Sequence, residues 1–252
     1  MTPNEKSKVL SEALPYIKQF FGKTIVIKFG GNAMIDKNLK QSFAKDLVLL
    51  KLVGMNPVVI HGGGPQINKS LAKSGEKPIF QEGIRVTNKK TLEIVTNVLN
   101  EVNQQIIDLV KENGGDANSY SNEKNLSIIQ AKKLQAKEKS HDLGFVGEII
   151  GVNSSFMKHL KEDGIIPIIA PIGIDSNNKT YNINADVVAS KFAEILSAEK
   201  LVLMTNTKGV LDKNKKLITG LVPNEIERLI SNGTISDGML PKINSAVHAA
   251  KH

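Results

Sequence analysis

Lys28 lies where an apolar segment gives way to glycine. Residues 25–27 predict a buried strand, and the pair Gly30 and Gly31 predicts the turn that ends it. In an open parallel sheet, ligands bind at the carboxyl ends of the strands. We therefore expect the Lys28 ammonium group to lie at the rim of a cleft and to act on a phosphoryl group.

A second glycine-rich segment, Gly62, Gly63 and Gly64, follows the apolar run 57–61 and precedes Pro65. Its spacing matches neither the GxGxxG nor the GxxxxGK[ST] fingerprint. Three glycines still let backbone amides approach an anion with no Cβ in the way, and the next helix N-terminus adds a dipole worth about 0.3–1 kcal/mol. We expect the two loops to form one anion cradle. A turn that only reverses the chain remains the alternative.

Arg85 lies in a segment, residues 76–87, whose pattern predicts a β-hairpin. Only two basic residues of the chain are arginine, and a guanidinium group fits a carboxylate with two parallel hydrogen bonds. If the hairpin folds back over the cleft, Arg85 lies beside the glycine loops. We expect it to bind a carboxylate there, and an ordinary surface arginine is the alternative.

Asn182, Asn184 and Asp186 alternate where a strand pattern leads into a helix pattern. Their side chains could point into one cleft. Alternatively, Asn184 caps the helix and Asp186 is its favourable first-turn acid, and the pattern leaves both interpretations open. Lys242 lies one residue after Pro241, on the first turn of the last predicted helix.

An alternation of strands and helices must position these side chains. The strongest strand patterns cover 25–28, 57–61, 165–170 and 201–205, and the strongest helix patterns cover 39–53, 91–110, 222–230 and 237–250. Residues 117–153 read as a hairpin or small antiparallel patch with a solvated turn at 132–141, and 154–161 as a short helix. The alternation predicts an α/β fold with a parallel sheet and right-handed crossovers.

Composition excludes several classes of protein. The chain has 252 residues, no apolar run near the ~20 residues of a membrane helix, and no signal-peptide pattern. It has no cysteine and no clustered histidine, so we expect no metal held by the protein. The net charge of +8 comes from scattered lysines with few aromatic residues, so we expect no nucleic-acid binding. A basic surface also suits small anions such as nucleotides and carboxylates.

Residues 9–21 predict an amphipathic helix in front of the first strand, with a kink at Pro15. This helix has no sheet of its own to cover. Packing on the core of the same lobe and docking on another subunit are both compatible with the pattern.

Six segments occur in this order: KFGGNAM, VIHGGGPQIN, GIRVT, YNINAD, TNTKGVL and DGMLPKINSA. As a set they resemble the N-acetylglutamate kinases of the amino-acid kinase family, from Val9 onward. Aspartate and carbamate kinases share the lysine-glycine strand but not this combination. The resemblance implies a three-layer αβα sandwich around one mostly parallel central sheet, and transfer of the ATP γ-phosphoryl group to the side-chain carboxylate of N-acetyl-L-glutamate in arginine biosynthesis.

The resemblance also implies roles for individual residues. Lys28 and Lys242 would flank the transferred phosphoryl group, and Asp186 would hold both ammonium groups and keep them protonated. The residues implied in acetylglutamate binding are Gly63, Gly64, Arg85, Asn182 and Asn184. The residues implied in nucleotide binding are Lys28, Gly30, Gly31, Asn32, Thr205, Asn206, Gly209, Val210, Leu211 and Lys242. Magnesium would arrive with ATP.

Larger-scale features follow from the same resemblance. Residues 1–22 would form an oligomerisation and regulatory helix with Tyr16 near an arginine site, 23–175 the acetylglutamate lobe and 176–252 the ATP lobe. The implied assembly is a hexamer made of three dimers, with arginine as feedback inhibitor and a PII protein as a further partner. We expect a cytoplasmic enzyme, or a stromal one if a plastid encodes it. The family continues through another strand and helix after the position of His252, so we expect the ATP lobe to be truncated.

Three other functions stay open at this point. A kinase for another acyl-amino acid, such as acetylaminoadipate, would share most motifs. A catalytically silent subunit that assembles and senses arginine would keep the fold. A basic nucleic-acid-binding protein would bind DNA in a salt-sensitive way.

Overall fold

The computed structural model describes residues 1–81, 83–120, 128–135, 142–153, 156, 164–236 and 239–251, and at Asn32 the backbone only. The helix expected at 154–161, except Phe156, and most of the turn expected at 132–141 lie outside the described residues. No helix of the described part is long and apolar enough to cross a membrane.

Five parallel strands form the central sheet, in the order β11–β1–β2–β8–β5. Their bounds are β1 Thr24–Phe29, β2 Asn56–His61, β5 Ala117–Ser119, β8 Ile166–Ile169 and β11 Lys200–Leu203. In β1 and β2 every residue but the first is buried, as expected for strands covered on both faces. Lys28 pairs with Ile60 on one side and Leu203 on the other, so three strands end around it. The predicted parallel α/β sheet is confirmed.

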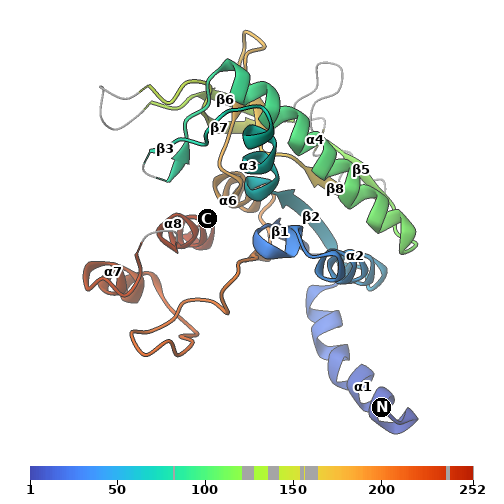
Figure 1. Cartoon of the computed structure of the whole chain (residues 1–252). Helices are drawn as coiled ribbons and strands as arrows, with labels where there is room; N and C mark the ends of the chain where they lie inside the picture. Colours follow the sequence, from blue (N-terminus) through green and yellow to red (C-terminus); the bar gives the residue numbers. More distant parts are fainter. Residues whose placement is uncertain are drawn as a thin grey trace.

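Three helices cover one face of this sheet, and Figure 1 shows them beside it. They are α2 Lys37–Leu52, α3 Gly64–Lys73 and α4 Lys89–Glu112. The predicted helices 39–53 and 91–110 are confirmed, and side-chain caps by Asp36 and Asn88 explain why each begins two residues early. Val95, Leu99 and Ile106 of α4 are buried in this layer, as the apolar stripe predicted.

The other face carries a helix, α6 Ala185–Ile195, and a second sheet. Its strands, in the order β10–β9–β6–β7, are β10 Thr180–Asn182, β9 Ile172–Ile174, β6 Ile129–Lys133 and β7 Gly147–Val152. β6 and β7 pair antiparallel, and Ile129 and Ile149 share a core cluster with Ile60 and Phe192. The predicted antiparallel patch is confirmed for β6 and β7, but it is wrong for 117–119, because β5 pairs parallel with β8 in the central sheet. The second sheet shares its core with the central sheet and completes the three layers.

The last two helices, α7 Pro223–Ser231 and α8 Met239–Lys251, form a small cluster with its own apolar contacts. α8 packs on α6 and β11, so it joins the body of the molecule along one side. The two-stranded hairpin β3 Phe80–Gln81 and β4 Ile84–Arg85 is also as predicted. A 3-10 turn, η1 Gly31–Met34, follows β1.

The N-terminal helix, α1 Pro3–Phe20, projects from the body as an arm (Figure 1). It begins six residues before the predicted start because Thr2 and Glu5 form a capping box. None of its residues is buried, and only Phe20 packs on the core. Of the two interpretations that the sequence left open, packing on the core of the same lobe therefore holds only for the last turn of the helix. The kink at Pro15 stays a prediction.

Candidate functional site

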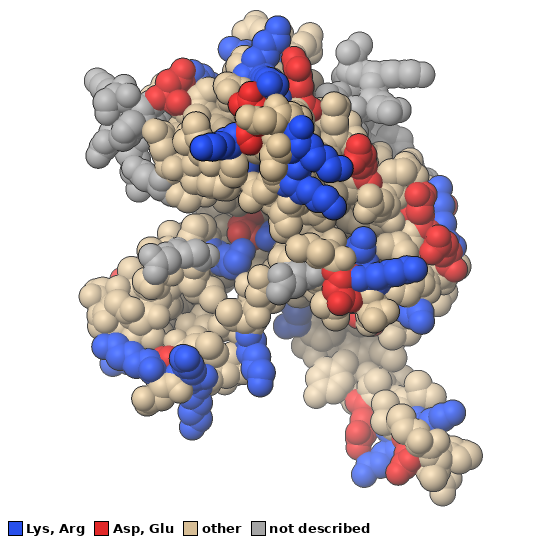
Figure 2. Space-filling model, in the orientation of Figure 1, with Lys and Arg blue, Asp and Glu red and all other residues tan. Residues whose placement is uncertain are grey.

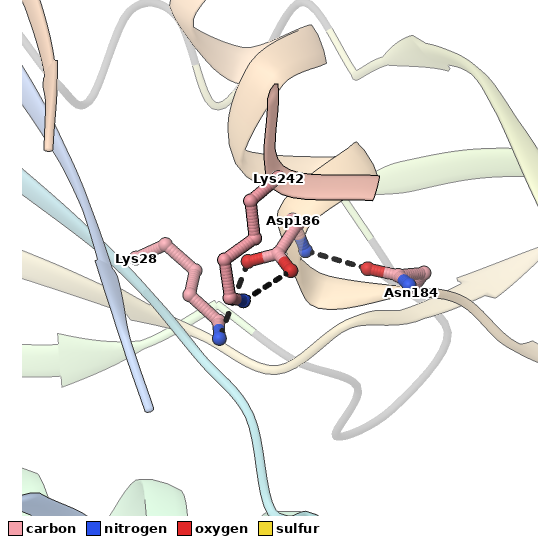
Figure 3. Close-up of polar contacts among 4 residues, drawn as sticks. All are labelled: Lys28, Asn184, Asp186 and Lys242. Atoms are coloured by element: carbon pink, nitrogen blue, oxygen red, sulfur yellow. Dashed lines mark hydrogen bonds and ion pairs between the residues drawn. The ribbon is translucent and has the colours of Figure 1, made fainter. Parts of the chain in front are cut away.

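Lys28, Asp186 and Lys242 meet at the carboxyl ends of the central strands (Figure 3). The Lys28 ammonium nitrogen lies 3.2 Å from Asp186 Oδ1, and the Lys242 ammonium donates a hydrogen bond of 2.8 Å to Oδ2. The side chains of Lys28 and Asp186 are 10% and 9% exposed, and that of Lys242 is 21% exposed. The structure thus brings together three residues that are 158 and 56 positions apart in the sequence, and leaves the cluster one positive charge in excess.

The absence of a side chain at Gly30 leaves the space that the Lys28 ammonium group occupies. A Cβ atom at Gly30 would lie 2.5 Å from Lys28 Nζ, so any other residue at position 30 would displace the ammonium group from its present position. Gly31 has φ +71° and lies against Asn206, which follows β11. The predicted glycine turn therefore serves two contacts at once, one to the lysine and one to the neighbouring loop.

Asp186 is held by the first turn of α6. Asn184 is the N-cap of this helix, and its side-chain oxygen accepts a hydrogen bond of 2.8 Å from the Asp186 backbone N–H. Both Asn184 and Asp186 also line the cavity described below. The two interpretations left open by the sequence are therefore both true: the cap fixes the helix start that aims the carboxylate at the lysines.

The electrostatic environment of Lys28 combines opposing effects. Burial lowers the pKa of Lys28 below its ordinary value, the Asp186 carboxylate raises it, and the nearby Lys242 ammonium lowers it. The net direction is downward. Asp186 thus opposes deprotonation of Lys28 as expected, but it does not cancel the cost of burial. An incoming anion would favour the charged lysine further.

A cavity of about 250 Å³ opens beside this cluster. Figure 2 shows a hollow between the α7–α8 region, at the lower left, and the body, with charged side chains inside. The cavity lining includes Lys28, Gly63, Gly64, Arg85, Asn182 and Asp186. Arg85 and the second glycine loop thus line one cavity, as expected if the hairpin folds back over the cleft, whereas Gly30 and Gly31 of the first loop are not among the lining residues. The size suits an amino-acid derivative rather than a polymer.

Arg85 is largely buried and lines this cavity. One guanidinium nitrogen, Nη2, donates a hydrogen bond of 2.7 Å to Asn68 Oδ1, and the group lies 4.7 Å from the Phe80 ring centre. The other, Nη1, is buried and has no hydrogen-bond acceptor in the described part of the chain. Burial lowers the pKa of Arg85, although a guanidinium group stays charged in proteins. A buried donor without a partner is costly, so a ligand oxygen there would be strongly favoured.

Two cavity residues, Arg85 and Asn182, are linked through Thr87, which the sequence did not single out. The Thr87 hydroxyl donates to the Arg85 carbonyl oxygen at 2.9 Å, and the Asn182 amide donates to the Thr87 hydroxyl at 3.2 Å. Asn68 was missed as well. Both residues lie in segments quoted above, VIHGGGPQIN and GIRVT, but those segments do not show the contacts, because each contact joins side chains on different elements.

Several predicted nucleotide residues lie outside the cavity. Among the described residues that line it, none belongs to loop 205–211. Asn206 contacts Gly31, whereas Val210 packs with α7 and α8, and Leu211 pairs with Leu217 in a β-bridge. Asn206 brings this loop beside the glycine turn. The roles of Thr205 and Gly209 stay predictions. The Asn32 side chain lies outside the described structure, and Tyr16 lies on the projecting α1.

His61, at the end of β2, is fully buried and was not predicted as a site residue. Its Nδ1 lies 3.0 Å from the Gly62 carbonyl oxygen, and Nε2 has no hydrogen-bond partner in the described structure. This pairing fits a neutral ring that carries its proton on Nδ1. Burial lowers the pKa of His61 to about 4.

We expect His61 to make the protein less stable in acid. Its pKa is about 4 when folded and about 6.5 when unfolded, so the unfolded chain binds more protons between these values. Stability therefore falls as pH drops from about 6.5 to 4, by about 3 kcal/mol in total. Urea unfolding at several pH values should show this slope in the wild type and a shallower one in His61→Gln. The chemical shift of the His61 ring protons, followed by NMR against pH in the folded protein, gives a direct check. A His61 ring that titrates near pH 6.5 would contradict the prediction.

The arrangement can perform one kind of chemistry well. Two ammonium groups on one carboxylate can bind a group with several negative oxygens, and a separate arginine can hold a carboxylate nearby. Among the described residues, no set of three or more histidine, aspartate or glutamate side chains could hold a metal ion. The site therefore suits the joining of two anions that repel each other in water.

Comparison with known proteins gives a consistent picture. A family model described as the amino acid kinase family matches residues 23–252. Acetylglutamate kinases of Aromatoleum aromaticum and an Azoarcus species are 54% and 55% identical over 259 residues, which cover all of this chain and 86% of each relative.

Solved structures agree with these matches. N-acetylglutamate synthase from Neisseria gonorrhoeae, complexed with coenzyme A and N-acetyl-glutamate, has a TM-score of 0.85 at 25% identity. The match covers 96% of this chain, which spans 55% of that protein. Carbamate kinase from Giardia lamblia, bound to AMP-PNP, has a TM-score of 0.61 at 16% identity over 91% of this chain and 90% of its own, a likeness of fold alone.

Proposed function

The chain belongs to the amino acid kinase family, and we propose that it transfers the γ-phosphoryl group of ATP to the side-chain carboxylate of N-acetyl-L-glutamate in arginine biosynthesis. The observation that carries this proposal is the pairing of Lys28 and Lys242 on Asp186 beside a cavity that contains Arg85. The whole-length similarity to acetylglutamate kinases supports the same substrate.

In this reaction the protein forms no covalent bond with either substrate. A carboxylate is already a nucleophile, so no general base is needed, and catalysis consists of positioning two anions and stabilising charge on the equatorial phosphoryl oxygens. Lys28 and Lys242 supply the positive charge at the transferred group, and Asp186 holds both ammonium groups in place. The reacting carboxylate attacks phosphorus, the bond to the β-phosphate oxygen breaks, and ADP leaves with the bond electrons.

The acetylglutamate site is the cavity itself. Arg85 Nη1 binds a substrate carboxylate, Asn182 contacts the rest of the molecule, and the amides at Gly63 and Gly64 face the reacting carboxylate. Asn184 lines the same space while it caps α6. Arg85 Nη1 supports this orientation most directly, because it is buried and has no acceptor among the described residues.

We place ATP on the other side of the lysines. Gly30 and Gly31 follow β1 and the loop 205–211 follows β11, so both segments lie beyond the carboxyl ends of these strands, where the β- and γ-phosphates would lie. Magnesium bound to those phosphates would neutralise part of their charge, and it needs no cluster of protein carboxylates. No step assigned to the residues above depends on it.

The proposal is tested with purified protein in an assay that couples ADP release to NADH oxidation. We expect turnover that requires both ATP and acetylglutamate, and much slower turnover with acetylaminoadipate, because one more methylene displaces the reacting carboxylate from the lysines. An absence of turnover under saturating substrates would contradict the proposal and favour a silent subunit. Faster turnover with acetylaminoadipate than with acetylglutamate would show that the substrate assigned here is wrong.

Gly64 allows a test of where the substrate lies. A Cβ atom at Gly64 would meet no atom within 4 Å, and the residue begins α3, where alanine is a better helix former. Gly64→Ala should therefore fold at least as stably as the wild type and keep its backbone donor. Its methyl group enters the cavity, so we expect the acetylglutamate KM to rise about tenfold. Lys73→Ala, at the exposed end of the same helix, is the control, and an unchanged KM in Gly64→Ala would show that the substrate lies elsewhere.

The projecting helix supports a proposal about assembly. Val9, Leu10, Leu14 and Tyr16 of α1 are exposed apolar or aromatic side chains, with Tyr16 64% exposed. We place them against the same helix of another copy, in a hexamer of three dimers. Light scattering should give six times the chain mass of 27.4 kDa, and a dimer alone would overturn the hexamer.

Three further expectations rest on the resemblance to the family. They are feedback inhibition by arginine near Tyr16, binding of a PII protein, and a cytoplasmic location. The division into an acetylglutamate lobe, 23–175, and an ATP lobe, 176–252, also rests on the resemblance to the family. Its boundary falls in the turn between β9 and β10.

A further inference from the structure

Lys242 depends on a helix that approaches the site from outside. α8 carries Lys242 and packs on α6, which carries Asp186. Three polar contacts join the two helices, each from one turn of α6 to the facing turn of α8: Asp186 with Lys242, Ser190 with Ser245, and Glu194 with His248. The α6 residues are spaced four apart and therefore lie on one face of their helix.

The middle contact is the most buried of the three. The Ser190 hydroxyl donates a hydrogen bond of 2.8 Å to the Ser245 carbonyl oxygen, and the two residues are 2% and 6% exposed. The contact between Glu194 and His248 involves an imidazole that is 46% exposed, and exposed ion pairs hold geometry weakly. The Ser190 hydrogen bond is shielded from water. Apart from the Asp186–Lys242 pair, it is therefore the contact that constrains the position of α8 on α6 most strongly.

Apolar packing alone would leave the position of α8 poorly defined. Side chains such as Ala189 and Phe192 of α6 and Ala249 of α8 share one apolar cluster, and such contacts tolerate small slides and rotations of one helix on another. A hydrogen bond from one hydroxyl to one carbonyl fixes both movements. Ser245 lies three residues after Lys242, about one turn along the same face of α8.

We propose that Ser190 is the positioning residue for Lys242: its hydrogen bond to the Ser245 carbonyl fixes α8 so that the Lys242 ammonium reaches Asp186 and the transferred phosphoryl group. This proposal rests on the proposed function only for its kinetic test. Ser190 touches neither substrate nor the reacting atoms, so it acts through Lys242.

A double-mutant cycle separates this role from a general structural one. Ser190→Ala should lower kcat about tenfold and leave the acetylglutamate KM within about twofold of the wild type, because a shift of about 1 Å in a catalytic group costs up to 10²-fold in rate. In a Lys242→Ala background, the same change should alter kcat by less than about twofold. An equal loss of kcat in both backgrounds, or a change in KM alone, would overturn the proposal.

The control is Ser231→Ala. Its hydroxyl donates to the Arg228 carbonyl at 2.9 Å within α7, so the substitution removes the same kind of bond without loosening α6 from α8. Its kcat should stay at the wild-type value. If Ser190→Ala does not fold, Ser190→Cys keeps the volume with a weaker donor, and the cycle is repeated with it.

A second measurement does not need turnover. The rate at which acetic anhydride labels Lys242, followed by mass spectrometry, should rise severalfold in Ser190→Ala and not in Ser231→Ala, since a displaced ammonium group loses its carboxylate partner. Unchanged labelling of Lys242 would overturn the positioning role. An inactive wild type whose Lys242 labelling responds to Ser190→Ala would contradict the proposed function alone.

Discussion

Replacing Asp186 with asparagine is expected to lower kcat about a thousandfold at neutral pH while the protein remains folded. The carboxylate contacts both ammonium groups, at 3.2 and 2.8 Å, and an amide keeps the shape but removes the charge. Lys28 and Lys242 would then repel each other without a counter-charge and leave the positions in which they stabilise the phosphoryl group.

The pH profile of the variant adds a second expected result. Burial and Lys242 lower the pKa of Lys28, and Asp186 is the group that raises it. Lys28 must be protonated to act, so the alkaline decline of kcat/KM should begin at a lower pH than an ordinary lysine would give. In Asp186→Asn it should begin lower still.

Glu199→Gln is the matched control for Asp186→Asn. Glu199 pairs with Lys23 at 3.4 Å on the surface, at the opposite end of β1, so the change removes a carboxylate charge away from the site. Its kcat should equal that of the wild type, because exposed pairs contribute little. If Asp186→Asn retained kcat within about threefold, the assignment of the lysine pair to phosphoryl transfer would be wrong.

Replacing Arg85 with alanine should act on substrate binding instead. We expect the acetylglutamate KM to rise about a hundredfold with a smaller change in kcat, because a charged hydrogen bond in a buried site is lost. Arg85→Lys should recover only part of the affinity. A lysine keeps the charge, but it cannot bond to Asn68 and to a substrate carboxylate with the same planar geometry.

The other arginine of the chain provides the control. Arg228 is exposed on α7, and Arg228→Ala removes the same charge without touching the cavity. Its KM for acetylglutamate and for ATP should match the wild type. An unchanged acetylglutamate KM in Arg85→Ala would move the carboxylate site away from the hairpin.

Local patterns were sufficient for most of the fold. Strands such as 57–61 are continuous apolar runs because both faces of a parallel sheet are covered, and α4 shows an unbroken apolar stripe. The helix ends were less well predicted. They depend on caps such as Asp36 and Asn88, whose side chains compete with several other local hydrogen bonds.

The surface against which α1 packs could not be predicted from its sequence pattern. An amphipathic stripe shows that a helix has something to cover, but it does not show what. The structure excludes the core of the same chain for most of α1, since none of its residues is buried. The choice depends on where the chain leaves the body, which is a property of the whole fold.

The chemical groups of this site could be identified from residue type and local pattern: Lys28 at the end of a strand, the glycines that let anions approach the backbone, and Asp186 and Lys242 at two helix starts. The contacts that hold these groups in place became visible in the folded chain. Asn68 of α3 bonds to Arg85 of β4, and Ser190 of α6 bonds to Ser245 of α8, and each contact joins two separate elements. The physical reason is that residue type and spacing record a local conformation, whereas a hydrogen bond between elements exists only after sheet and helices have packed.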